Sequence, residues 1–156
     1  MGFIWRCYEK YYMAKSEEMF KDCKWLVEEY KMKFREFETS TGKLVLAGKS
    51  AENNEELVSQ VGKEEIVLHT AKPGSPFVNI KAKSKEVNKK ELKESAIFCA
   101  SKSKDWRDSK SDVDVHWFYG KDIYKIKGMD KGTFGVKKFK NIKIKKKEIE
   151  EFILKG

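Results

Sequence analysis

Proline, cysteine and arginine are scarce in this chain of 156 residues, which contains two prolines, three cysteines and three arginines. So few prolines, with only ten glycines, exclude a collagen-like or proline-rich linker protein. Cys7, Cys23 and Cys99 are isolated and odd in number, so they argue against a disulfide framework and for a reducing compartment. We therefore expect a cytoplasmic protein.

Long hydrophobic runs are missing as well. No stretch approaches the roughly 18–20 apolar residues of a membrane span, so we expect no membrane-embedded segment. Residues 1–12 do not form a secretory signal, because their apolar run is short and charges follow it at once. We expect these twelve residues to be a dispensable extension, since Met13 precedes a stretch that is typical of the N-terminus of a protein.

The motifs of several enzyme classes are also absent. His69 and His116 have no metal-ligand spacing and there is no C-x-x-C pair, so we expect no metal site. Neither of the two common glycine-rich phosphate-binding motifs, G-x-x-x-x-G-K-[ST] and G-x-G-x-x-G, occurs in the sequence, and this argues against an NTPase. His69, Ser75 and Asp105 make a catalytic triad only on paper, because no G-x-S-x-G elbow accompanies them. We expect no catalytic residues and no cofactor.

Positive charge, by contrast, is abundant. Lysine and arginine together number 34 against 25 acidic residues, and 31 of the 34 are lysines, so the formal net charge is +9. A lysine ammonium is a point charge suited to phosphate, whereas the arginine fork suits the edge of guanine. The composition therefore favours a nucleic acid contacted through its backbone. A+T-rich codon usage and a heat-adapted surface are the alternative explanations.

The surplus charge lies almost wholly in residues 121–147, which hold eleven lysines and two aspartates. Apolar residues interleave with these lysines, and the alternation in 125–127 and 143–145 predicts strands with lysine on one face. A coherent positive face is typical of nucleic-acid binding, and protection of exposed strand edges is the alternative. The candidate contacts in this block are Lys125, Lys127, Lys137, Lys138, Lys140 and Lys143.

Hydrophobic periodicity and turn signals predict interspersed helices and strands. Asn88 and Glu91 form a candidate capping box, and residues 103–111 are expected to be a loop. Helices are expected at 16–31, 50–61, 88–102 and 145–154, with strands at 34–37, 44–46, 66–69, 77–80, 113–119, 123–126, 133–139 and 142–144. We expect a single α+β domain with a mixed or mainly antiparallel sheet and flanking helices.

Four motifs follow one another in a specific order. An aromatic strand and a glycine turn lead to G-K-S-A-x-x-N-E within 33–58, and a strand ending in His69 leads to P-G-S-P. A helix ending in S-K-x-W and a final set of strands complete the series. In this order the motifs resemble the NFACT-R (NFACT RNA-binding) domain family. Ser50 stands where the family often has aspartate, and Thr70 and Ala71 depart from its usual acidic position.

This resemblance implies an RNA-binding module. NFACT-R domains end the large ribosome-quality-control proteins, which bind stalled large ribosomal subunits and tRNA, and they also occur alone. The resemblance implies tRNA or rRNA as partner, with the large ribosomal subunit as a further candidate. The peptide-tailing activity of the large proteins is not carried over, because it is tied to an additional N-terminal domain that a chain of 156 residues is too short to contain. The NFACT-R-like domain is expected at 33–147, after an N-terminal extension and helix at 1–32 and before a C-terminal helix end at 148–156. A protein-interaction adaptor and a DNA-binding protein are the alternatives.

The first two motifs supply further candidate contacts. Lys49 stands at the start of the 50–61 helix, where free N–H groups favour an anion. Asn54 can donate to phosphate or to a 2′-hydroxyl, unless it lies on a solvated helix face. Ser75 belongs to the P-G-S-P turn, whose backbone N–H groups suit an anion, and Lys72 lies beside this turn.

Four further residues have two interpretations each. His69 either fills a buried hydrogen-bonding position or contacts phosphate or base from its strand end. Lys104 precedes Trp106, which is either a stacking platform for an unpaired base or part of the core. The same two alternatives hold for Tyr124 and Phe139, which lie between lysines.

Overall fold

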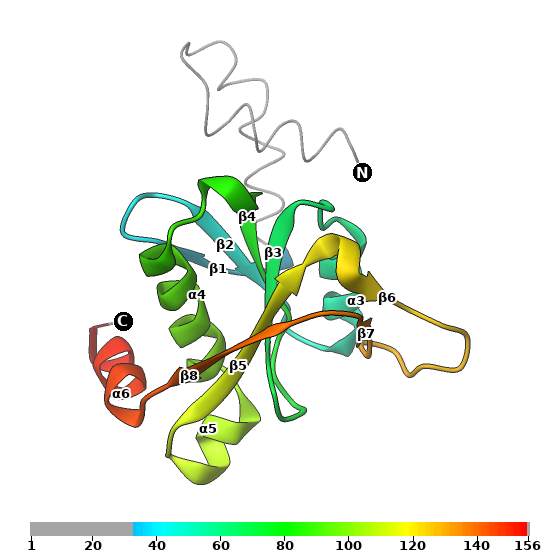
Figure 1. Ribbon diagram of the computed structural model, residues 1–156. Coiled ribbons are helices and arrows are strands. Elements are labelled where there is room, and N and C mark those ends of the chain that lie inside the picture. Colours follow the sequence, from blue (N-terminus) through cyan, green and yellow to red (C-terminus); the bar gives the residue numbers. More distant parts are fainter. Residues whose placement is uncertain (1–32, 156) are drawn as a thin grey trace.

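The computed structural model describes residues 33–155 (Figure 1). The expected extension at 1–12 and the expected helix at 16–31 lie outside these residues. Within them, six strands form one sheet in the order β1-β2-β4-β3-β5-β8, and every neighbouring pair is antiparallel. The strands are β1 (Arg35–Glu38), β2 (Leu44–Ala47), β3 (Glu65–Thr70), β4 (Val78–Lys83), β5 (Val113–Tyr119) and β8 (Lys140–Ile144).

A second, two-stranded sheet pairs β6 (Ile123–Tyr124) with β7 (Gly135–Val136). The helices are α3 (Ala51–Ser59), α4 (Lys89–Ser101), α5 (Lys104–Ser109) and α6 (Lys146–Lys155), with short 3₁₀ turns η1 (Ser84–Glu86) and η2 (Gly120–Asp122). The expected α+β class and mainly antiparallel sheet are therefore confirmed. The expected capping box is present too, because Asn88 and Glu91 satisfy each other's backbone N–H groups at the start of α4.

Residues on the two faces of the sheet build two hydrophobic cores. Along β2, Val45 and Ala47 face one core while Leu44 and Leu46 face the other, so all four side chains are buried. Helices α4, α5 and α6 cover the first core, to which Ile149 of α6 contributes a fully buried side chain. Helix α3 and the β6–β7 hairpin cover the second core (Figure 1).

The segment at 103–111, expected to be a loop, contains α5 instead. Ser103 is the N-cap of this helix, and its Oγ accepts a hydrogen bond from the backbone N–H of Trp106 at 3.1 Å. The same hydroxyl donates to the carbonyl of Ala100 at 2.7 Å, so Ser103 links the end of α4 to the start of α5. The prediction was wrong because a single buried serine and one core tryptophan stabilise a polar six-residue helix.

Candidate nucleic-acid interface

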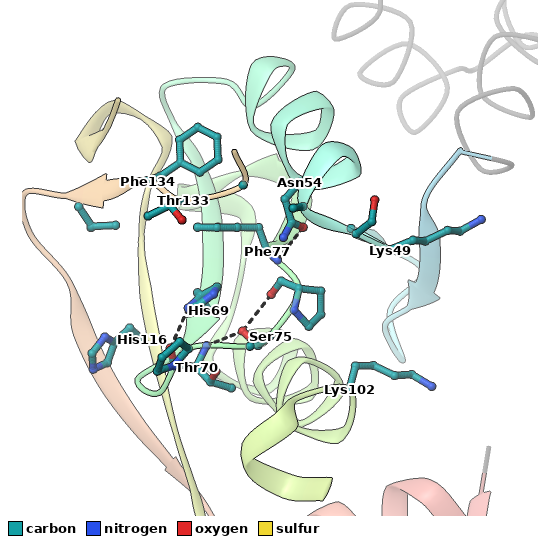
Figure 2. A pocket seen from close by; sticks show the side chains of 18 of the residues that line it. Lys49, Asn54, His69, Thr70, Ser75, Phe77, Lys102, His116, Thr133 and Phe134 are labelled. Atoms are coloured by element: carbon teal, nitrogen blue, oxygen red, sulfur yellow. Dashed lines mark hydrogen bonds between the residues drawn. The ribbon is translucent and has the colours of Figure 1, made fainter. Parts of the chain in front are cut away.

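A pocket of about 560 Å³ lies on the α3 side of the sheet, between the β3–β4 loop, the start of α3 and the β6–β7 hairpin (Figure 2). Its lining contains five basic residues, which are lysines or arginines, and two histidines, but no aspartate or glutamate. Positive charge is therefore concentrated there with no carboxylate in the wall to neutralise it. The basic residues are Arg35, Lys49, Lys102, Arg107 and Lys131.

The start of α3 forms one wall of the pocket. Ser50 is the N-cap, and its Oγ accepts from the backbone N–H of Asn53 at 3.1 Å. The Asn53 side chain accepts in turn from the backbone N–H of Lys49 at 2.8 Å. These reciprocal bonds fix the backbone at the place where the positive end of the helix dipole meets the pocket.

Asn54 lies behind this cap and is only 9% exposed, so the solvated-face interpretation of this residue is wrong. Its Oδ1 accepts a hydrogen bond from the backbone N–H of Phe77 at 3.2 Å, which ties α3 to the residue preceding β4. Among residues 33–155, the Nδ2 of Asn54 donates no hydrogen bond, and the bond to Oδ1 is the one that its side chain makes. A buried amide donor in the pocket wall is therefore left for a ligand.

The β3–β4 loop forms the opposite wall and is held by its own side chains. Ser75 accepts from the backbone N–H of Thr70 at 3.1 Å and donates to the carbonyl of Pro76 at 3.2 Å. The hydroxyl of Thr70 donates to the carbonyl of Lys72 at 2.6 Å. The two hydroxyls are thus occupied by the loop itself. Ser75 shapes the pocket wall more than it offers a free hydroxyl to it.

His69 is a hydrogen-bonded residue of β3, as the first interpretation expected, and it also lines the pocket, where its contact to phosphate or base stays a prediction. Its Nδ1 donates to the carbonyl of Thr70 at 2.7 Å, and its ring lies 4.5 Å from that of Phe77, centroid to centroid. Burial lowers the pKa of His69 below 6.5, although hydrogen bonds that favour the charged form act in the opposite direction. The imidazole is therefore neutral at pH 7.

An aromatic pair completes the lining. His116 of β5 stacks on Phe139, with ring centroids 4.1 Å apart and an interplanar angle of 21°. Phe139 remains 54% exposed, so the ring face turned away from His116 is open to solvent. Burial also lowers the pKa of His116, which the nearby Asp114 carboxylate only partly offsets, so this ring stacks as a neutral group.

Trp106 does not have the role of a stacking platform. Its side chain is 4% exposed and packs into the core beneath α4, so no face of the ring is available to a base. The structure therefore corrects that candidate contact and supports the core interpretation. Lys104, two residues earlier, packs its aliphatic stem against Gly74, where a Cβ would lie 2.9 Å from the Cβ of Lys104.

Two candidate lysines are engaged by carboxylates. Lys125 forms an ion pair with Glu55 of α3 and also donates to the carbonyl of Asp130 at 2.8 Å. Because Glu55 also accepts from the backbone N–H of Gly132 at 2.8 Å, this cluster holds the hairpin onto α3, and Lys125 has a structural role in it. Lys72, which is 71% exposed, lies 3.5 Å from Asp105.

The late lysines do not share the single face expected from their alternation. Strand β6 ends at Tyr124 and Ile126 is 60% exposed, so residues 125–127 are not a half-buried strand. Along β8, Lys143 lies opposite Asp114 on the pocket side, whereas Lys140 lies opposite Trp117 and its Nζ is 5.2 Å from the centre of that ring. Lysines therefore line both faces of an edge strand, as the edge-protection alternative predicts.

The pocket thus brings together four of the predicted contacts, namely Lys49, Asn54, His69 and Ser75. Sequence reasoning did not identify five further residues of the lining, which come from separate elements and share no local motif: Arg35, Lys102, Arg107, Lys131 and His116. One available signal was the rarity of arginine, since the two arginines among residues 33–155 both line the pocket. Lys127, Lys137 and Lys138 are exposed and outside the lining.

The described residues contain neither a metal-binding cluster nor a membrane-spanning helix. Among residues 33–155, no group of three or more histidine, cysteine, aspartate or glutamate side chains is arranged to hold a metal ion. In the same residues, no helix has the length and apolar character needed to cross a membrane.

Comparison with known proteins places the chain. A family model described as the NFACT protein RNA binding domain matches residues 33–138. The chain belongs to this family. Apart from Phe139, every residue that lines the pocket lies within the matched span, so the pocket is built by the family domain itself.

Two known proteins resemble this chain over about three quarters of its length. The archaeal Rqc2 homolog aRqcH of Methanocaldococcus jannaschii is 34% identical over 118 residues, which are 75% of this chain and 17% of that protein. The C-terminal structure of the fibronectin/fibrinogen-binding protein from Streptococcus suis has the same fold, with a TM-score of 0.66 and 21% identity. That match covers 76% of this chain and 48% of the other. The chain spans less than half the length of either of these proteins.

Proposed function

We propose that this chain binds RNA through the pocket described above, chiefly by contacts to phosphate. The observation that carries the proposal is a lining with five lysines and arginines and no carboxylate. Phosphate binding gains from such a site, because the cations are already gathered and counterions are released when RNA replaces them. Membership of the NFACT protein RNA-binding family supports the same partner.

Three of the pocket cations are available to a phosphate. Within residues 33–155, Arg35, Lys102 and Arg107 have no carboxylate within ion-pair distance. A phosphate that binds them displaces no internal partner, so the full charge contributes to binding. Lys131 is 65% exposed and lies 3.8 Å from Glu52, a long contact that a phosphate can replace.

Further lysines extend the positive surface beyond the pocket. Lys137 and Lys138 immediately precede Phe139, and Lys143 lies on the pocket side of β8. Lys104 and Lys127 are exposed as well and lie outside the lining. We assign these lysines to a rim along which the RNA backbone continues outside the pocket.

The biological setting we propose is translation, with tRNA or rRNA as the bound RNA and the large ribosomal subunit as the assembly that presents it. The support is the relative named as an archaeal Rqc2 homolog, which links this family to ribosome quality control. No chemical step is assigned to the chain. RNA binding by itself accounts for the pocket.

The test is a fluorescence anisotropy titration of a labelled 12-nucleotide single-stranded RNA at several salt concentrations. With about four phosphate contacts, the logarithm of the affinity falls against log salt with a slope of about −3, or roughly fiftyfold between 50 and 200 mM. The double variant Lys102→Glu/Arg107→Glu is expected to bind at least about tenfold more weakly. The control, Lys147→Glu/Lys155→Glu on α6, makes the same change in net charge outside the pocket.

Three results would contradict the proposal. One is an absence of salt-dependent binding, and the second is equal loss of affinity in the pocket variant and the α6 control. The third is association with ribosomes that survives nuclease treatment while free RNA does not bind, which indicates a protein-interaction adaptor instead. DNA of the same sequence, titrated in parallel, separates an RNA-binding domain from a general polyanion-binding or DNA-binding one.

A further inference from the structure

The pocket has two chemically different ends. In Figure 2, Lys49 and Lys102 lie on one side of the pocket and His116 on the other, with His69 and Ser75 between them. The first end is cationic and adjoins the start of α3. The second end is aromatic, because His116 stacks there on Phe139. A ligand that fills the pocket therefore needs an anionic group at one end and a flat, apolar face at the other.

The aromatic end is suited to stacking. Phe139 is among the few large hydrophobic side chains of residues 33–155 that remain more than half exposed. One face of its ring is supported by His116 at 4.1 Å and the other is open. A base that stacks on this open face buries apolar area and continues a stack that has already begun with the imidazole ring.

The middle of the pocket selects a polar ligand. The hydroxyls of Thr70 and Ser75 are already occupied by the β3–β4 loop, as described above. The amide Nδ2 of Asn54 is the donor left unsatisfied, and it belongs to a side chain only 9% exposed. A sugar or phosphate oxygen satisfies this donor, whereas a purely apolar ligand leaves it without a partner at a cost.

We infer that the pocket takes one unpaired nucleotide of the bound RNA, with its phosphate at the Lys49–Lys102 end and its base stacked on Phe139. This inference rests on the function proposed above and narrows it. A volume of about 560 Å³ lies within the range of about 300–1,000 Å³ found for small-molecule sites. A base that is paired inside a helix presents no free face to an aromatic ring, so the nucleotide must be unpaired.

The test compares a labelled eight-nucleotide single-stranded RNA with the same RNA annealed into a blunt duplex, using anisotropy at fixed salt. Phe139→Ala is the central variant, because an exposed ring can be removed without opening the core. Phe139→Tyr keeps an aromatic face and serves as the conservative variant. Leu154→Ala, which removes a side chain that is 86% exposed on α6, is the matched control.

The unaltered chain is expected to bind the single strand more tightly than the duplex. Phe139→Ala is expected to weaken single-strand binding about tenfold, in line with the measured worth of base stacking, and to leave the salt slope unchanged. Phe139→Tyr should restore the affinity, and Leu154→Ala should not change it. The unchanged slope matters because a variant that merely distorts the cationic end would lower it.

Two different failures can be told apart. If Phe139→Ala binds the single strand as tightly as the unaltered chain, with the salt slope intact, the nucleotide assignment is overturned while RNA binding stands. Duplex binding as tight as single-strand binding overturns it in the same way. If the unaltered chain shows no salt-dependent binding to either RNA, the proposed function fails and the inference fails with it.

Discussion

Gly48 and Asn54 are in such close contact that a Cβ at position 48 would lie 1.8 Å from the Oδ1 of Asn54. The glycine is therefore required for this amide to reach the backbone N–H of Phe77, which it bonds at 3.2 Å. This pair joins the end of β2, the first turn of α3 and the start of β4 at the cationic wall of the pocket. The contact between Gly48 and Asn54 is thus a condition for the stability of this wall.

Gly48→Ala is accordingly expected to lower the free energy of unfolding by about 2 kcal/mol or more, since it both overpacks the site and breaks a buried hydrogen bond. In an Asn54→Ala background the two closest atoms are gone, so the same substitution should cost much less. Urea unfolding of the four proteins in this double-mutant cycle measures the difference. Strictly additive effects would show that the two residues do not constrain each other.

The contact between Glu55 and the β6–β7 hairpin predicts a pH dependence. The hydrogen bonds from Lys125 and from the backbone of Gly132 hold the pKa of Glu55 below its ordinary value of 4.5. Because the folded-state pKa is lower than the unfolded-state one, this stabilisation is complete above the unfolded pKa and is lost as the pH falls through the folded pKa. Acid below about pH 4.5 should therefore loosen the hairpin.

Glu55→Gln is expected to lower the free energy of unfolding at pH 6. Between pH 5 and 3, this variant is expected to lose less of its remaining stability than the unaltered chain loses. Urea unfolding midpoints across the pH range measure both effects. Glu151→Gln on α6 is the control, since it is exposed and has no ion pair among the described residues. A pH profile of Glu55→Gln that runs parallel to that of the unaltered chain would contradict the assignment.

The bond from His69 to the Thr70 carbonyl predicts a single tautomer. A carbonyl oxygen only accepts, so Nδ1 must carry the proton in the neutral ring. Burial lowers the pKa, so His69 should become charged only below pH 6.5. Nitrogen NMR of the two ring nitrogens between pH 5 and 8 measures both properties. An Nε2-protonated ring, or a titration midpoint above 6.5, would disprove this geometry.

Much of the fold could be predicted because its signals are local. The capping box at Asn88 and Glu91 and the positive φ of 88° at Gly42 in the first hairpin are both set by neighbouring residues. Helix α5 was missed because Trp106, which anchors it, is held by a core assembled from distant strands. When a polar stretch contains a single aromatic residue, the sequence alone does not show whether that residue will be buried.

The site was predictable only in part. Lys49, Asn54, His69 and Ser75 stand in the motifs that the family shares, and the fold brings all four to the pocket. The lysine-rich block drew attention to Lys125, which Glu55 neutralises from a helix 70 residues away in sequence. Net charge by segment cannot reveal such pairing, because it counts a lysine equally whether or not a carboxylate covers it.

Trp106→Phe tests the corrected role of this tryptophan. The smaller ring leaves part of a buried site unfilled, so the free energy of unfolding should fall by about 1–3 kcal/mol. Affinity for single-stranded RNA should stay within about threefold, since the ring is 4% exposed and lies outside the pocket lining. Chemical denaturation and anisotropy on the same sample measure both. A large loss of RNA affinity with unchanged stability would restore the stacking interpretation.

The most direct test of the central claim is a ¹⁵N–¹H NMR titration of the chain with a short single-stranded RNA. The lining of the pocket contains no acidic residue. If this pocket is the binding site, the backbone amide signals that shift should be those of its walls, namely Lys49, Ala51, Gly74, Ser75 and Thr133. Signals from α6, which contributes nothing to the lining, should stay in place. Shifts confined to α6 and the α4 side of the sheet, with the pocket amides unmoved, would contradict the account.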